Sequence, residues 1–270
     1  MKVRDQVVVV TGGAQGIGRA LCDRFRREGA RAVVVVDLKE TAAEQAAREL
    51  GGIAFGCDVR IEAELRRVIE ETEKRAGPIG LFCSNAGIFP GGVDPDQAAS
   101  GANESWNQAW TLNVMAHVYA ARALVPRMVA RGGGYFLNTV SAAGLLSQIG
   151  NSIYSTTKHA AVGFAESLAI THRDQGIRVS ILCPQGVQTP MLRDIGGGAQ
   201  NVDGVLTPEQ VADAAVEGLA RETFLILPHP QVADYMRRKT ENYERWIAGM
   251  AKLRRNLASS PTGSAGADRR

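Results

Sequence analysis

A tyrosine and a lysine four positions apart are the residues of this sequence best suited to acid/base chemistry. Tyr154 and Lys158 stand in the segment Tyr-Ser-Thr-Thr-Lys, and Ser141 precedes them at the end of an apolar run. Residues i and i+4 of a helix lie on the same face, so we expect the Lys158 ammonium close to the Tyr154 phenol. Tyr154 is therefore a candidate general acid/base.

A single positive charge is strong enough to lower the pKa of the phenol to near neutral pH. Moving a phenol pKa from about 10 to near 7 requires roughly 4 kcal/mol of differential stabilisation. A unit charge about 4 Å away contributes on the order of 4 kcal/mol at an effective dielectric constant of about 20. We therefore expect Lys158 to lower the pKa of Tyr154.

A glycine-rich turn, Thr11-Gly-Gly-Ala-Gln-Gly-Ile-Gly18, follows the first apolar run. Gly12 permits a tight turn, Gly16 lets a pyrophosphate approach the N-terminus of the next helix, and Gly18 lets helix and strand pack closely. The spacing G-x-x-x-G-x-G differs from the fingerprint of two-domain dehydrogenases. The segment predicts a dinucleotide site, although such a run can also be only a turn.

Asp37 ends the second apolar run, roughly twenty residues beyond the glycines. A carboxylate there can accept hydrogen bonds from the adenosine ribose and repels a 2′-phosphate, which favours NAD over NADP. No basic residue occupies Ala14, Gln15 or Leu38, although Lys39 is adjacent. The alternative is that Asp37 only caps a helix.

A bound nicotinamide ring, which is positively charged when oxidised, would add to the effect of Lys158 on the pKa of Tyr154.

Two further apolar runs are followed by residues that could contact the cofactor. Asp58 follows the third run and could accept from an adenine amino group, or it could cap the next helix. Asn85-Ala86-Gly87 follows the fourth run, and its small residues would let the backbone pass close to a ribose, or the segment could be a simple turn.

Short apolar runs alternate with longer helical patterns, which predicts βαβ units and a doubly wound parallel sheet of about seven strands with helices on both faces. The expected strands cover 7–10, 32–36, 53–55, 80–83, 135–137, 179–183 and 224–227. The expected helices cover 16–28, 40–50, 61–76, 105–131, 152–175 and 208–221. We expect a single α/β domain over residues 1–257, including one long amphipathic C-terminal helix over about 230–257, and a disordered tail over 258–270.

These residues resemble, in order and spacing, the single-domain branch of the short-chain dehydrogenases/reductases. The resemblance spans roughly residues 3–228 and is carried by the following matches: Thr11-Gly-x-x-x-Gly-x-Gly18, Asp58, Asn85-Ala-Gly87, Asn113, Ser141, Tyr154-x-x-x-Lys158 and Pro184 through Thr189. It implies a single-domain Rossmann fold and hydride transfer with a nicotinamide cofactor.

The resemblance implies a catalytic tetrad. Tyr154 exchanges a proton with the substrate oxygen, Ser141 orients that oxygen, and Lys158 holds the ribose while lowering the tyrosine pKa. Asn113 completes the set by distorting a helix and holding a water that links the lysine to solvent; locally it could also be a surface helix residue. Val187 and Thr189 are expected to contact the nicotinamide carboxamide.

The expected cofactor site combines these motifs and their neighbours. It comprises Gly12, Gln15, Gly16, Ile17, Gly18, Asp37, Leu38, Asp58, Val59, Asn85, Ala86, Gly87, Tyr154, Lys158, Pro184, Val187 and Thr189. One departure from the family pattern is Gln185, which stands where glycine usually follows the proline. Another is the length of the C-terminal segment.

The expected substrate pocket is mostly apolar, which predicts a hydrophobic or alicyclic substrate. It draws on Ile88, Phe89, Ala143, Gln148, Asn151, Gln185 and the loop from Met191 to Gly198. The C-terminal segment needs an apolar partner, which could be the domain, a neighbouring subunit or the active site below a lid. Family resemblance implies that the helices of Asn113 and Tyr154 form a dimer or tetramer interface.

Composition excludes several other functions. The net charge of +3 is small and the basic residues are scattered, so no nucleic-acid partner is expected. The four cysteines and four histidines show no metal-ligand spacing, so no metal is expected. No apolar run approaches membrane-spanning length and none precedes the first strand, so no membrane partner is expected and a cytoplasmic setting is predicted.

The sequence thus predicts an NAD-dependent short-chain alcohol dehydrogenase or carbonyl reductase acting on a secondary alcohol or ketone. Two alternatives stay open. One is a catalytically silent NAD(H)-binding sensor or assembly subunit, against which the intact Ser141, Tyr154 and Lys158 argue. The other is an NADPH-dependent biosynthetic carbonyl reductase, which a comparison of the two cofactors would separate.

Overall fold

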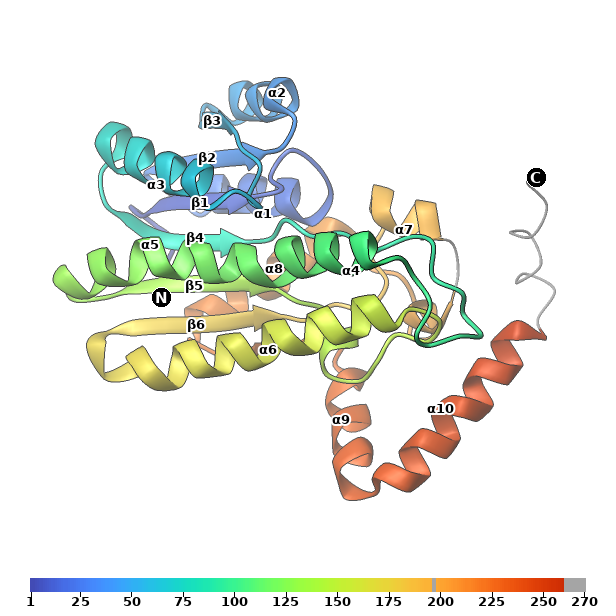
Figure 1. Ribbon diagram of the computed structural model, residues 1–270. Coiled ribbons are helices and arrows are strands. Elements are labelled where there is room, and N and C mark those ends of the chain that lie inside the picture. The colour runs from blue at the N-terminus through green and yellow to red at the C-terminus, as the bar shows by residue number, and fades with distance from the viewer. Residues whose placement is uncertain (196–197, 260–270) are drawn as a thin grey trace.

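Seven parallel strands form one twisted sheet in the order β3-β2-β1-β4-β5-β6-β7 (Figure 1). The computed structural model describes residues 1–195 and 198–259. The strands are β1 (Val7–Thr11), β2 (Ala32–Asp37), β3 (Ile53–Gly56), β4 (Ile79–Ser84), β5 (Gly134–Thr139), β6 (Ile177–Leu182) and β7 (Leu225–Ile226). The strand order reverses its direction of growth beside β1, which places a crevice between the carboxyl ends of β1 and β4.

Helices cover both faces of the sheet because successive strand residues point to opposite sides. In β1, Val8 and Val10 join the apolar core on one face, whereas Val7 and Val9 join the core on the other. The first core receives α1 (Gly16–Arg27), α2 (Glu40–Leu50) and α8 (Pro208–Ala220). The second receives α3 (Glu62–Ala76), α5 (Ala116–Ala130) and α6 (Ser152–His172), which lie in front of the sheet in Figure 1. The predicted doubly wound parallel fold is confirmed.

The helix expected over 105–131 is divided into three parts. The α4 helix (Asn103–Trp110) leads into a π-helical turn, η1 (Thr111–Met115), and α5 follows. The side chain of Asn113 bonds both backbone groups of Ile88, and this fixed attachment lies at the centre of the widened turn. Such π turns concentrate at functional sites.

Short helices occupy two loops for which no element was expected. A 3₁₀ turn, η2 (Ala142–Gly144), follows β5. The helix expected over 152–175 ends in another 3₁₀ turn, η3 (Arg173–Gln175), which directly follows α6. After β6 come α7 (Pro190–Ile195) and a third 3₁₀ turn, η4 (Ala199–Asn201). Runs this short carry too few apolar positions to show a helical period.

The C-terminal segment forms two helices where one was expected. The α9 helix (Gln231–Glu241) and the α10 helix (Tyr243–Ala258) meet at Asn242, whose backbone is extended and whose side chain accepts from the Arg245 N–H to cap α10. Asparagine is more favourable at an N-cap than inside a helix. The apolar pattern of the sequence continues across Asn242, so it predicted one helix instead of two. Figure 1 shows α10 turning away from the body of the sheet. Most of the tail expected over 258–270 lies outside the described residues.

Within residues 1–195 and 198–259, none of the helices combines the length and apolar character needed to cross a membrane.

Candidate active site

One large cavity lies at the carboxyl edge of the sheet, with a volume of about 800 Å³. Of the predicted cofactor and catalytic residues, only Asn113 does not line it. Its lining includes Gly12, Gln15, Gly16, Ile17, Gly18, Asp37, Leu38, Asp58, Val59, Asn85, Ala86, Gly87, Ser141, Tyr154, Lys158, Pro184, Val187 and Thr189. The fold therefore brings together segments that are separated by more than half of the sequence.

The glycine-rich turn packs too closely for side chains. A Cβ on Gly18 would lie 2.1 Å from the carbonyl oxygen of Gly12, and Gly12 and Gly16 have φ angles of +64° and +54°. The Thr11 hydroxyl accepts from the backbone N–H groups of Asn85 and Ala86 at 2.9 and 3.1 Å, which ties the ends of β1 and β4 together. The resulting cradle leaves the N-terminus of α1 open to the cavity, an arrangement that can bind an anion.

Asp37 lies at the end of β2 and faces this turn. Its carboxylate accepts from the backbone N–H groups of Ala14 at 3.2 Å and Lys39 at 3.3 Å. It does not cap α2, because the N-cap position is Lys39 and no side chain caps that end. The carboxylate is held at the cavity wall, as recognition of a ribose requires.

The carboxylate of Asp58 forms an ion pair with Arg60, a residue that was not predicted to belong to the site. The Arg60 guanidinium donates to both carboxylate oxygens and lowers the pKa of the Asp58 carboxyl. Arg60 itself lines the cavity beside Asp58. Asn85 donates to the Thr11 carbonyl oxygen at 3.0 Å, so its carboxamide supports the turn.

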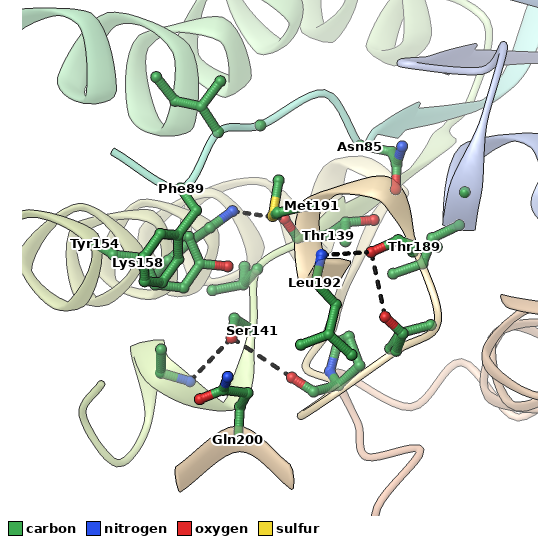
Figure 2. A pocket seen from close by; sticks show the side chains of 18 of the residues that line it. Asn85, Phe89, Thr139, Ser141, Tyr154, Lys158, Thr189, Met191, Leu192 and Gln200 are labelled. Carbon is green, nitrogen blue, oxygen red and sulfur yellow. Dashed lines mark hydrogen bonds between the residues drawn. The ribbon is translucent and has the colours of Figure 1, made fainter. Parts of the chain in front are cut away.

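Tyr154, Lys158 and Ser141 converge on one region of the cavity (Figure 2). Ser141 accepts from the Ala143 N–H at 3.1 Å, in the first turn after β5, and its hydroxyl lies 3.5 Å from the Pro184 carbonyl oxygen. Asn151 caps α6 by accepting from the Tyr154 N–H at 2.9 Å, which places Tyr154 in the first turn of that helix. The ring of Phe89 packs on the Tyr154 ring with centroids 4.8 Å apart.

The expectation that Lys158 by itself depresses the Tyr154 pKa is wrong. Burial raises the pKa of Tyr154 to about 12, and the hydrogen bond with Ser141 opposes this rise only in part. Burial also lowers the pKa of Lys158 to about 8. The lysine nitrogen lies 5.6 Å from the centre of the tyrosine ring, and desolvation of the buried phenolate outweighs its attraction.

Lys158 is held by the end of β5. Its ammonium donates to the Thr139 carbonyl oxygen at 3.3 Å, and the side chain is 4% exposed. A Cβ on Gly87 would lie 3.4 Å from the same nitrogen and 3.1 Å from the Asn113 side-chain oxygen. A side chain at Gly87 would therefore press mainly on the Asn113 oxygen, which would have to move by a few tenths of an ångström.

Asn113 is fully buried behind this region and does not line the cavity. Its side-chain oxygen accepts from the Ile88 N–H at 2.9 Å, and its nitrogen donates to the Ile88 carbonyl oxygen at 3.0 Å and to the Thr157 hydroxyl at 3.2 Å. The surface-residue alternative is wrong, because this buried asparagine joins η1 to α6 and to the irregular segment after β4.

The outer part of the cavity is mostly apolar. Ile88, Phe89, Ala143, Gln148, Gln185, Met191, Leu192 and Ile195 line it as expected. Asn151 does not, because its side chain is used to cap α6 and to bond the Pro90 carbonyl oxygen. Residues 196 and 197 of the expected loop lie outside the described residues.

Several residues that line the outer cavity were not predicted from the sequence. Leu112 and Leu146 line it, and Tyr235, Trp246, Met250 and Leu253 add a wall from α9 and α10. The apolar residues of α9 and α10 repeat with a helical period over about 230–257, and this pattern was visible in the sequence. The pattern did not show which surface these residues would contact. The backbone of Gln185 is held in place by a hydrogen bond: its N–H donates to Nδ1 of the buried His229 ring at 3.1 Å.

No cluster of metal-ligating side chains occurs in the part of the chain that the structure describes.

Comparison with known proteins identifies the family. The sequence model of the short chain dehydrogenase family matches residues 6–199. The chain is 32% identical to 1-deoxy-11-beta-hydroxypentalenate dehydrogenase of Streptomyces exfoliatus over 92% of both chains. It is 30% identical to mouse epidermal retinol dehydrogenase 2, covering 84% of this chain and 75% of the relative.

Solved structures agree in fold. A short-chain dehydrogenase/reductase from Burkholderia phymatum in complex with NAD superposes with a TM-score of 0.79 at 26% identity, covering 91% of this chain and 96% of that one. A 3-ketoacyl-(acyl-carrier-protein) reductase from Brucella melitensis, complexed with NADH, gives a TM-score of 0.74 at 26% identity, covering 83% and 96%. By sequence and by fold, the chain belongs to the short-chain dehydrogenase/reductase family of oxidoreductases.

Proposed function

We propose that the protein is an NAD-dependent oxidoreductase that interconverts a bulky, largely apolar secondary alcohol and the corresponding ketone, with Tyr154 as the general acid/base. One observation carries this proposal. The Tyr154 hydroxyl region and the glycine-rich turn line the same cavity, so a cofactor seated on the turn can reach a substrate held at Tyr154. Bound NAD would accept or supply the hydride.

The raised pKa of Tyr154 suits the reductive direction. At neutral pH the phenol is protonated and can donate its proton to a ketone oxygen, while Ser141 holds that oxygen. The oxidative direction requires the phenolate. The positive charge of an oxidised nicotinamide ring would favour it, which adds to the contribution of Lys158.

Three features support NAD as the cofactor and an apolar molecule as the substrate. Asp37 places a carboxylate where a 2′-phosphate would be repelled. The outer cavity is lined by Phe89, Leu146, Met191 and the wall from α9 and α10. The relatives named above act, by their names, on a hydroxypentalenate and on retinol, which are compatible with such a cavity.

We also propose a cytoplasmic protein that assembles through the helices of Asn113 and Tyr154. The four cysteines are free and buried, which suits a reducing compartment. Trp110 at the end of α4 and Ile170 on α6 are exposed apolar side chains on this side of the molecule, which suits contact with a second subunit. Sedimentation of the purified chain tests the assembly.

Turnover of a substrate panel tests the enzymatic proposal. Polycyclic and isoprenoid secondary alcohols with NAD⁺, and the matching ketones with NADH, should give a change in nicotinamide absorbance. We expect Tyr154→Phe to abolish turnover and to leave NAD affinity within a few fold, because the hydroxyl acts in proton transfer. Tyr119→Phe, a change outside the cavity, serves as the control. Tight NAD(H) binding with no turnover on any member would instead favour the sensor alternative.

A further inference from the structure

The backbone N–H of Gln185 is bonded to a side chain where the sheet would place a backbone carbonyl. Between β6 and β7, the Cys183 N–H donates to the Ile226 carbonyl oxygen at 3.0 Å. Along a parallel pair, a strand donates to the same neighbour at every second residue, so the next bond would join the Gln185 N–H to the carbonyl of residue 228. The Gln185 N–H instead donates to Nδ1 of His229 at 3.1 Å. The imidazole therefore replaces a backbone acceptor at the end of the sheet.

His229 is held as a neutral ring in one tautomer. It is 2% exposed and lies between β7 and the start of α9. Burial lowers the pKa of its imidazole, and the Gly204 backbone and the charge of Asp203 oppose this shift only in part. A neutral imidazole has one donor nitrogen and one acceptor nitrogen. Because Nδ1 accepts from the Gln185 N–H, the proton of the ring is on Nε2.

The peptide unit that carries this N–H also contacts the turn of Ser141. The Pro184 carbonyl and the Gln185 N–H belong to one planar unit, and in a trans peptide they point in opposite directions. The carbonyl accepts from the Ala142 N–H at 2.9 Å and lies 3.5 Å from the Ser141 hydroxyl, which donates to it. One rigid plane therefore connects the imidazole to η2, and a rotation of this plane would break the bonds at both of its ends.

The neighbouring peptide is held independently of His229. The Gly186 N–H donates to the Gln200 carbonyl oxygen at 2.8 Å, and the Gly186 carbonyl accepts from the Leu206 N–H at 3.0 Å. The loop after β6 is thus attached to the segment before α8 by its own backbone bonds. Loss of the imidazole would free the Pro184–Gln185 peptide and leave the rest of this loop in place.

We propose that His229 is a positioning residue for Ser141: its Nδ1 fixes the Pro184–Gln185 peptide, and the carbonyl of that peptide holds the turn that carries the serine hydroxyl. His229 does not line the cavity, so it acts through this peptide and not on the substrate. The link to catalysis rests on the proposed function, in which Ser141 holds the substrate oxygen.

Amide hydrogen exchange tests the peptide contact on the full-length protein without substrate or cofactor. His229→Leu removes the acceptor, whereas His229→Asn places a carboxamide oxygen close to the position of Nδ1. In His229→Leu we expect the Gln185 and Ala142 amides to exchange about tenfold faster than in the wild type, because both ends of the peptide are released. In His229→Asn both rates should stay close to the wild type. The Cys183 amide, which is bonded within the sheet, reports whether each variant is folded.

A double-mutant cycle with Ser141→Ala tests the link to the serine. We expect His229→Leu to lower kcat by about tenfold in the wild-type background and to leave the NAD dissociation constant within a few fold. In the Ser141→Ala background the same replacement should change the residual kcat by less than about twofold, because the hydroxyl through which His229 acts is absent. His172→Leu, at the end of α6 and outside the cavity, is the matched control, for which we expect wild-type kinetics.

Three outcomes would overturn the proposal. The first is unchanged exchange of the Gln185 and Ala142 amides in His229→Leu. The second is an equal loss of kcat in both backgrounds, since His229 would then not act through Ser141. The third is an equal loss in His229→Asn, because the shape of the ring would then matter and not its acceptor. Absence of turnover by the wild type would instead count against the proposed function, whereas the exchange rates would still decide whether His229 holds the peptide.

Discussion

At the scale of single residues, burial decides the properties of the acid/base pair. Tyr154 and Lys158 are i, i+4 neighbours on α6; Lys158 is buried and Tyr154 is partly buried, so each charged form is penalised. The spacing in the sequence showed which residues would meet, but it held no information on how far solvent would be excluded. Burial makes the charged form of Lys158 costly for the folded state, and this cost can be measured as a change in the free energy of unfolding.

Replacing Lys158 should stabilise the fold at neutral pH. Its pKa falls from 10.5 to about 8 on folding, a difference worth about 3 kcal/mol. The unfolded state binds more protons between these two values, so wild-type stability rises as pH increases from 8 to 10.5. We expect Lys158→Met to have a higher free energy of unfolding at pH 7, and the advantage to shrink as pH approaches 10.

Urea unfolding at several pH values measures this difference. The exposed Lys252 on α10 provides the matched control, Lys252→Met, for which we expect no such pH dependence. A destabilised Lys158→Met at pH 7 would contradict the prediction, since it would mean that the bond to the Thr139 carbonyl outweighs the desolvation of the ammonium.

Asp37 is expected to set the choice of cofactor. Asp37→Ala should narrow the preference for NAD over NADP by roughly tenfold, because the repulsion of a 2′-phosphate is removed while Lys39 and Arg60 stay at the same end of the cavity. The ratio of kcat/KM for the two cofactors, or of their dissociation constants, measures the change. Glu44→Ala, on the outer face of α2, is the control. A constant ratio would show that another group contacts the ribose, and a wild-type preference for NADP would support the biosynthetic reductase alternative.

At the scale of elements, α9 and α10 act as a wall for the outer cavity. Their chain lies beyond the segment that matches the family model, and α10 contributes no buried residue to the core. The wall is attached by Lys239, which donates to the Leu145 carbonyl oxygen, and by the ion pair of Arg254 with Asp96. Trp246, Met250 and Leu253 share one face of α10 toward the cavity.

The wall is expected to select for bulky substrates. Trp246→Ala should raise KM for a polycyclic alcohol by roughly tenfold, because contact with the ring system is lost, and should leave a small cyclic alcohol nearly unaffected. Ile247→Ala is the matched control, since Ile247 is the next residue of α10, is 58% exposed and does not line the cavity. Steady-state kinetics with both substrates measures the effect. Equal losses for the two alcohols would mean that α10 does not contact the substrate.

At the scale of the whole molecule, the sequence determined the sheet and the order of its motifs, and it predicted most of the residues that line the inner cavity. Valine-rich runs and glycine spacing act over a few neighbouring residues, so they can be read directly from the chain. The tertiary structure alone decided the directions of the pKa shifts of Tyr154 and Lys158, the π turn at Asn113 and the wall from α9 and α10. Each of these depends on solvent exclusion or on contact between distant segments, and neither is encoded in local spacing.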